Sequence, residues 1–121
     1  MSENEWSADV ELDEFTTAIE GGINYWAEIV AYKWDRAKWY AEIIEWGAGS
    51  DSTPGRHRID REVIRRGMQV LADSKSSRFS GVYCGVVRSG FQATEAWWDA
   101  VDADTADQVV QAGLFGEVVY G

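Results

Sequence analysis

Apolar residues recur at helical spacing near the start of the chain, between residues 9 and 20. Three of them would share one face of a helix: Leu12, Phe15 and Ile19. Acidic residues cluster in the first turn, where the helix dipole favours negative charge. Gly21 and Gly22 follow as a stop signal, and we expect them to turn the chain into a strand with positive φ angles. The pattern predicts a helix over residues 9–20.

Residues 24–46 are dense in aromatic and β-branched side chains, which favour strands. Asp35, Arg36 and Ala37 would form a short connection between two such strands, as in a β-hairpin. The segment also fits a helix, because one helical stripe would carry six of its residues: Trp26, Val30, Trp34, Ala37, Ala41 and Ile44. We expect the hairpin, since a pleated surface suits this many rings better, and the helix stays open as the alternative.

A surface loop is predicted over residues 47–57, which contain the only proline and several turn-forming residues. Asp60 then has the character of a helix N-cap, and the helix would run to about Ala72. Its inward face would carry three apolar residues: Ile64, Met68 and Leu71. On its outer side, Glu62 and Arg66 are spaced to form an i, i+4 ion pair.

Residues 78–98 give no clear prediction, because glycines interrupt an apolar stretch that fits either a strand or a closely packed helix. The final segment is clearer. Asp104 is the predicted N-cap of a helix that ends at Gly116, and its inward positions follow the helical template: Ala106, Val109, Val110, Gly113 and Leu114. Gly113 and Gly116 favour close packing of this helix on a sheet, and residues 117–120 predict a terminal strand.

These elements together predict a small α+β domain over residues 9–121, preceded by a flexible segment at residues 1–8. The domain would combine an N-terminal helix, an antiparallel β-hairpin or small sheet, two further helices and a short C-terminal strand. A length of 121 residues fits a single domain. Seven Trp, five Tyr and four Phe residues supply enough apolar area for a sizeable core.

Charge is distributed unevenly along the chain, although the net charge is −10. Residues 1–55 carry 12 acidic and 3 basic side chains, residues 56–90 carry 3 and 8, and residues 91–121 carry 6 acidic and no basic ones. Two interpretations of the basic middle segment stay open. Its arginines pair with carboxylates within the fold or across a dimer, or they form an anion-binding patch.

Four arginines define the candidate anion site: Arg56, Arg58, Arg61 and Arg65. The last three would fall on one helical face, where guanidinium groups can hold a phosphate or stack on a ring. A net charge of −10 repels a phosphate backbone at long range. The row therefore favours a small anionic ligand or an acidic protein surface over duplex nucleic acid.

The tryptophans outnumber the central positions of so small a core, so we expect some of them at the surface or at an interface. Two adjacent pairs are the candidate binding residues: Tyr25-Trp26 and Trp97-Trp98. The simplest explanation for exposed aromatic residues of this kind is an interface between copies of this chain in a homo-oligomer.

Catalytic and metal-binding patterns are not found in the sequence. His57 and Cys84 are the only histidine and the only cysteine, and an inert thiol and a solvated loop histidine are favoured over a nucleophile–base pair. One cysteine excludes an internal disulfide and a cysteine-based zinc cluster. The acidic clusters at residues 9–14 and 99–107 do not have calcium-loop spacing, and we interpret them as helix caps and solvated faces. We expect no enzyme activity, no metal and no cofactor.

Two stretches resemble parts of short, uncharacterised proteins encoded by tailed phages and prophages. The first is Glu20-Gly21-Gly22-Ile23-Asn24-Tyr25-Trp26. The second runs from Asp104-Thr105-Ala106-Asp107 through Gln111 to Phe115-Gly116-Glu117-Val118-Val119-Tyr120-Gly121. Those proteins similarly show EGG-x-x-YW after an N-terminal helix and end in FGE-x-VYG. The resemblance implies a phage-type origin and a fold that brings the two ends together, and it implies no activity.

The predicted function is that of a non-enzymatic phage accessory protein that acts by binding. It would inhibit a bacterial defence system or host factor, with nucleic-acid mimicry by its acidic flanks as one variant. The alternatives are a protein that sequesters a nucleotide-like anion and a homo-oligomeric structural protein. Apolar runs of 18 residues and a secretory signal pattern are missing from the sequence, so we expect no membrane contact and a location in the bacterial host cytoplasm.

Overall fold

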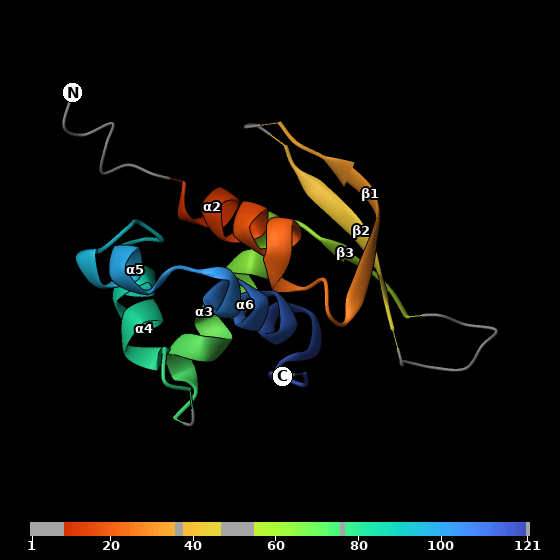
Figure 1. Cartoon of the computed structure of the whole chain (residues 1–121). Helices are drawn as coiled ribbons and strands as arrows, with labels where there is room; N and C mark the ends of the chain where they lie inside the picture. Colours follow the sequence, from red (N-terminus) through yellow and green to blue (C-terminus); the bar gives the residue numbers. More distant parts are fainter. Residues whose placement is uncertain (1–8, 36–37, 47–54, 76, 121) are drawn as a thin grey trace.

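A three-stranded antiparallel sheet lies against a layer of helices in the computed structural model, which describes residues 9–35, 38–46, 55–75 and 77–120 (Figure 1). The predicted α+β class is confirmed. The predicted flexible segment at residues 1–8 lies outside the described residues.

The first helix, α2 (Val10–Thr17), begins at Asp9, whose carboxylate accepts the backbone N–H of Leu12, and it continues as a π-helical turn, η1 (Ala18–Gly22). The helix predicted over residues 9–20 is confirmed. The positive φ angles expected at Gly21 and Gly22 are wrong, because both residues belong to the π-helical turn. Gly22 instead permits a close approach, since an added Cβ would lie 2.8 Å from the carbonyl oxygen of Ala103.

The sheet consists of β1 (Ala27–Lys33), β2 (Tyr40–Glu45) and β3 (Gly55–Ile59) in the order β1-β2-β3. The first two strands confirm the hairpin over the helical alternative. The third strand corrects the loop predicted over residues 47–57, of which residues 47–54 lie outside the described part. Its register pairs Ile59 with Ala41 and Gly55 with Glu45. This strand forms because β2 offers it a partner, although its own sequence, Gly-Arg-His-Arg-Ile, is not typical of strands.

Helix α3 (Arg61–Asp73) begins after Asp60, whose side chain accepts the N–H of Val63 at 3.2 Å, so the predicted N-cap is confirmed. The predicted inward residues are buried: Ile64, Met68 and Leu71. The ion pair predicted for Arg66 with Glu62 is replaced by a 2.8 Å hydrogen bond from Arg66 Nε to the carbonyl oxygen of Gly113.

Helix α6 (Ala103–Phe115) packs closely on α3, as Figure 1 shows for the centre of the helical layer. A Cβ added to Gly67 would lie 1.9 Å from the carbonyl oxygen of Val109, and one added to Gly113 would lie 2.1 Å from that of Val63. Gly113 therefore permits contact between two helices, which corrects the expected packing of this glycine on a sheet.

The two ends of α6 differ in how well they follow the prediction. Its N-cap is Asp102 rather than the predicted Asp104, because Asp102 and Thr105 bond to each other's backbone N–H groups in a capping box. Gly116 ends the helix with a left-handed φ of 78°, as predicted. Residues 117–120 do not form the predicted strand. Their backbone is held instead by a side chain of α6, described below.

Helices α4 (Ser80–Arg88) and α5 (Glu95–Ala100) occupy most of the segment for which the sequence gives no clear prediction. They bury three large side chains against the rest of the core: Tyr83, Val86 and Trp97. None of the described helices combines the length and the apolar character that crossing a membrane requires.

Candidate functional site

A buried carboxylate on α6 joins the two stretches that resemble phage proteins. Asp107 is 4% exposed and accepts hydrogen bonds from Tyr25 Oη at 2.6 Å and from Trp26 Nε1 at 2.7 Å. Gln111 Nε2 donates to the same carboxylate at 2.9 Å. Partial burial and the bond to Asp107 raise the pKa of Tyr25 to about 12. Trp26 is therefore a core residue, whereas the ring of Tyr25 remains 54% exposed.

The C-terminal segment is held by the other end of the Gln111 amide. Gln111 Oε1 accepts the backbone N–H groups of Val119 and Tyr120, both at 2.7 Å. The ring of Tyr120 stacks on Trp26 with centroids 5.2 Å apart. These contacts bring together the two stretches that resemble phage proteins, as predicted, through Tyr25 and Trp26 on one side and Asp107 and Tyr120 on the other.

The candidate nucleophile and base lie on different sides of the helical layer. His57 is on β3 rather than in a loop, and its Nε2 lies 2.8 Å from Glu45 Oε1. Glu45 also accepts the hydroxyl of Tyr120, and this bond, followed by burial, raises the pKa of that tyrosine. Cys84 is partly buried on α4, which α3 and α6 separate from the sheet (Figure 1). His57 is thus engaged by Glu45, the residue that also bonds to Tyr120 of the C-terminal segment.

A second buried carboxylate supports the opposite end of the helical layer. Glu14 is fully buried, and its Oε2 accepts the hydroxyl of Tyr83 and, at 3.0 Å, Nε1 of Trp97. Its Oε1 has no hydrogen-bond partner among the described residues. Burial raises the pKa of Glu14 to about 7. Trp97 is thus a core residue, and only its neighbour Trp98, 41% exposed, is accessible to a partner.

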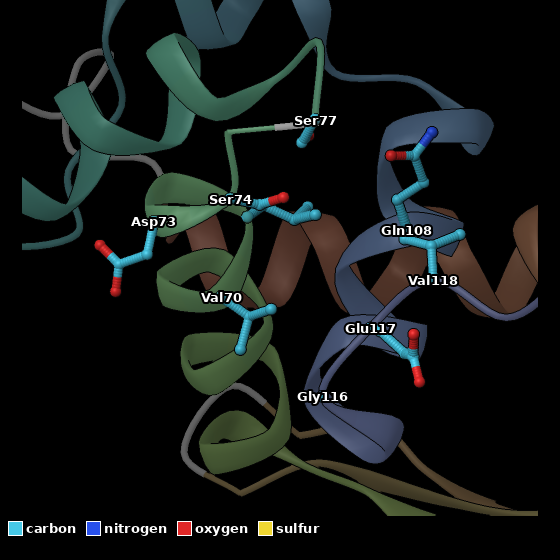
Figure 2. A pocket seen from close by; sticks show the side chains of 9 residues that line it. Val70, Asp73, Ser74, Ser77, Gln108, Gly116, Glu117 and Val118 are labelled. Carbon is cyan, nitrogen blue, oxygen red and sulfur yellow. The ribbon is translucent and has the colours of Figure 1, made fainter.

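A groove of about 540 Å³ lies between the C-terminal half of α3 and the segment that follows α6 (Figure 2). Its rim carries the carboxylates of Asp73 and Glu117, the hydroxyl groups of two serines and the amide of Gln108. Within the described ranges, no cationic side chain lines this groove. Its two carboxylates therefore disfavour the small anionic ligand that the sequence analysis considered. The predicted binding residues do not line this groove.

The structure divides the predicted arginine row between two elements. Arg61 and Arg65 lie on α3 and pair with acidic residues of α2. Arg61 is 2.9 Å from both Asp9 and Glu11, and Arg65 also bonds to Glu11. Burial raises the pKa of Asp9, but the hydrogen bonds from Arg61 and a backbone N–H outweigh it and lower that pKa overall. For these two arginines, pairing within the fold is confirmed.

A pocket of about 220 Å³ lies beside this pairing, between the start of β2 and the start of α3. Two arginines and one lysine line it together with two carboxylates and an aromatic ring: Arg58, Arg61, Lys38, Asp60, Glu62 and Trp39. The carboxylates offset most of its positive charge. The pocket therefore gives only weak electrostatic support for anion binding.

The register places Arg56 and Arg58 on the outer face of the sheet, and the helices cover its other face (Figure 1). Arg58 also reaches Asp60, the N-cap of α3, at 3.8 Å. Cross-strand partners share a face, so the register places three rows there: Glu28–Ile44–Arg56, Ala31–Glu42–Arg58 and Lys33–Tyr40. Arg56 lies 3.4 Å from Glu42, and the guanidinium of Arg58 lies 4.1 Å from the centre of the Tyr40 ring. These contacts hold both arginines extended over the sheet surface.

Exposed apolar side chains also gather on the sheet half of the molecule. Of the large apolar residues that are exposed in the described part, five lie in or beside the β1–β2 hairpin: Tyr25, Val30, Tyr32, Trp34 and Trp46. Of these five residues, only Tyr25 was predicted from the sequence to be a binding residue. The bounds of the predicted hairpin contained the missing signal, because Trp34 and Trp46 directly follow the ends of β1 and β2.

Comparisons with protein families, with curated proteins and with solved structures found no match to this chain. The resemblance of its two ends to phage proteins therefore stays a prediction. The outer face of the sheet, with the exposed aromatic residues at its strand ends, is the candidate functional site.

Proposed function

We propose that this protein acts by binding another protein through the outer face of its sheet, as a phage-type accessory protein that inhibits a bacterial host or defence protein. The observation that carries the proposal is the concentration of arginine, tyrosine and tryptophan side chains on the sheet half. These residue types supply most of the binding energy at protein interfaces. On the helical half, by contrast, Tyr83 and Trp97 use their hydrogen-bond donors internally, on Glu14.

The outer face is suited to an acidic or mixed-charge partner surface. The side chains of Arg56 and Arg58 are 61% and 48% exposed, and both lie on a strand, so their positions are defined by the sheet. The same face also carries Glu28, Glu42 and Lys33, so positive and negative side chains alternate on it. A partner would have to match the positions of these charges and not only their sum. Such a mixed face gives little support to the nucleic-acid-mimic variant, which requires a run of negative charge.

The small-anion alternative is less favoured by the arrangement of the arginines. Arg61 and Arg65 already bond to Asp9 and Glu11, and the adjoining pocket of about 220 Å³ is smaller than most ligand sites, which span about 300–1,000 Å³. Binding of an anion there would require the existing ion pairs to separate. On the sheet face, the ion pairs of Arg56 with Glu42 and of Arg58 with Asp60 are longer, at 3.4 Å and 3.8 Å, and hold the two guanidinium groups less tightly.

Affinity capture followed by a binding isotherm tests the proposal. The protein is used to capture its partner from a bacterial host, and the identified partner is then titrated with purified wild type and with the double variant Arg56→Ala, Arg58→Ala. We expect the affinity to fall by at least about tenfold, which corresponds to about 1.4 kcal/mol, because truncation removes two central contacts.

Arg88 supplies a matched control, since it is an exposed arginine at the end of α4. Helix α4 lies on the far side of the helical layer from the sheet (Figure 1). Arg88→Ala should bind the partner as the wild type does, and thermal unfolding should show that all variants are folded. Equal affinities for the double variant and the wild type would contradict the proposed binding face.

A further inference from the structure

One edge of the sheet is unpaired within the described part of the chain. β1 bonds to β2 along one side, and no described strand lies on its other side. Residues 30–33 of this strand are all exposed, and Val30 and Tyr32 are 41% and 49% exposed. Such an edge presents backbone N–H and C=O groups that can pair with a further strand.

A β-bulge in β1 changes which side chains share a face. The register shifts between Ile29 and Ala31, so Val30 is an extra residue without a direct partner. Glu28 pairs with Ile44 before the bulge, and Lys33 pairs with Tyr40 after it. Because Ile44 and Tyr40 are four residues apart on β2, they point to the same face. Glu28 and Lys33 therefore both lie on the outer face, whereas a regular strand would place them on opposite faces.

The bulge makes β1 self-complementary about a point between Val30 and Ala31. Ile29 and Tyr32 are the next residues on either side of this pair. Both lie on the inner face, because their partners on β2 are the buried residues Ile43 and Ala41. The residues beyond these, Glu28 and Lys33, both lie on the outer face and carry opposite charges. When a second β1 runs antiparallel to the first, residues on the same face therefore lie opposite each other, and Glu28 lies opposite the oppositely charged Lys33.

We infer that β1 pairs antiparallel with β1 of a second copy of this chain, about a two-fold axis between Val30 and Ala31. Glu28 of one copy then lies opposite Lys33 of the other, and the two-fold axis gives two such pairs. Ile29 of one copy likewise lies opposite Tyr32 of the other. A two-fold interface of this kind repeats each favourable pair. Parallel in-register pairing would instead place Glu28 beside Glu28 and Lys33 beside Lys33. The dimer has a continuous six-stranded sheet, and it leaves Arg56 and Arg58 exposed.

Charge reversal across this axis provides a direct test by sedimentation velocity over a range of protein concentrations. Glu28→Lys places lysine opposite lysine, and Lys33→Glu places glutamate opposite glutamate. Each single variant should raise the dimer dissociation constant by about tenfold or more, because two attractive pairs become repulsive. An equimolar mixture of the two single variants should restore the dimer, and so should the double variant Glu28→Lys, Lys33→Glu.

Two control variants change the net charge equally at exposed positions outside β1: Glu20→Lys and Lys75→Glu. Both should dimerise as the wild type does. A wild-type chain that stays monomeric up to its solubility limit would overturn the inference, and so would single variants that dimerise normally or a mixture that stays monomeric. This test is independent of the proposed function, which concerns Arg56, Arg58 and a foreign partner.

Discussion

Two buried carboxylates set the positions of three aromatic side chains in the core. Asp107 accepts the donor of Trp26, and Glu14 accepts those of Tyr83 and Trp97. A tyrosine or tryptophan buried without such a partner would lose a hydrogen bond that it makes in water. The carboxylates therefore let the chain bury polar-tipped rings, and the excess of tryptophan in the sequence is partly explained by this pairing.

Glu14 predicts a specific dependence of stability on pH. Its pKa is raised from 4.5 to about 7 in the folded protein by burial, so the folded state holds the proton more tightly than the unfolded state. The resulting stabilisation is complete below the unfolded pKa and is lost as the pH rises through about 7. Glu14→Gln is neutral at every pH and should not show this loss.

Urea unfolding at about pH 5 and about pH 8 measures the effect. Between these two values, the free energy of unfolding of the wild type should fall by on the order of 1–3 kcal/mol more than that of Glu14→Gln. Asp13, whose pKa is also raised by burial and by Asp9, is present in both proteins and cancels in the comparison. Parallel pH profiles would show that Glu14 does not titrate in this way.

The elements that could be predicted from the sequence are those whose signals are local. The N-terminal helix and α3 each begin at an aspartate cap, and α6 ends at Gly116, so periodicity and caps indicated them correctly. β3 could not be predicted in this way, since only Ile59 in it is a buried apolar residue and its partner strand β2 belongs to a different part of the sequence. The expected terminal strand is absent from residues 117–120 because Gln111 satisfies two of their backbone N–H groups.

The candidate site was predictable only in part, for the same reason. Arg56 and Arg58 were selected for their charge, but they were assigned to a row that the structure divides between β3 and α3. Neighbouring residues also differ in burial, as Trp97 is fully buried and Trp98 is 41% exposed. A six-residue helix such as α5 contains too little periodic pattern to show which of the two rings faces inward.

The contact between α3 and α6 should be the most sensitive to added volume. Gly67→Ala and Gly113→Ala would each place a Cβ within about 2 Å of a backbone carbonyl oxygen, and the helices would have to separate. We expect each variant to lower the free energy of unfolding by about 2 kcal/mol or more, measured by chemical denaturation.

Gly81 in α4 provides the matched control for this prediction. A Cβ added at Gly81 meets no heavy atom within 4 Å, so Gly81→Ala should stabilise the protein by up to about 1 kcal/mol through helix propensity. If all three substitutions had the same effect, the close approach of α3 and α6 would not be a determinant of stability.

At the scale of the whole molecule, the two sides differ in how they use their polar groups. On the helical side, Arg61 pairs with Asp9 and Glu11, and the network around Asp107 joins residues 25 and 26 to the C-terminal part of the described chain. On the sheet side, no described strand covers the β1 edge, and exposed aromatic residues lie at the strand ends. The helical side is thus a scaffold, and the sheet side is the surface available to partners.

Photo-crosslinking in bacterial cells tests this division most directly. A photoreactive amino acid replaces Ile44, on the outer face of the sheet, in one variant and Gly81, on α4, in the other. Both variants should fold, because Ile44 is partly exposed and Gly81 has open space around it. We predict a covalent adduct with a specific host protein from position 44 and none from position 81. A specific adduct from position 81, with none from position 44, would contradict the assignment of the sheet as the binding side.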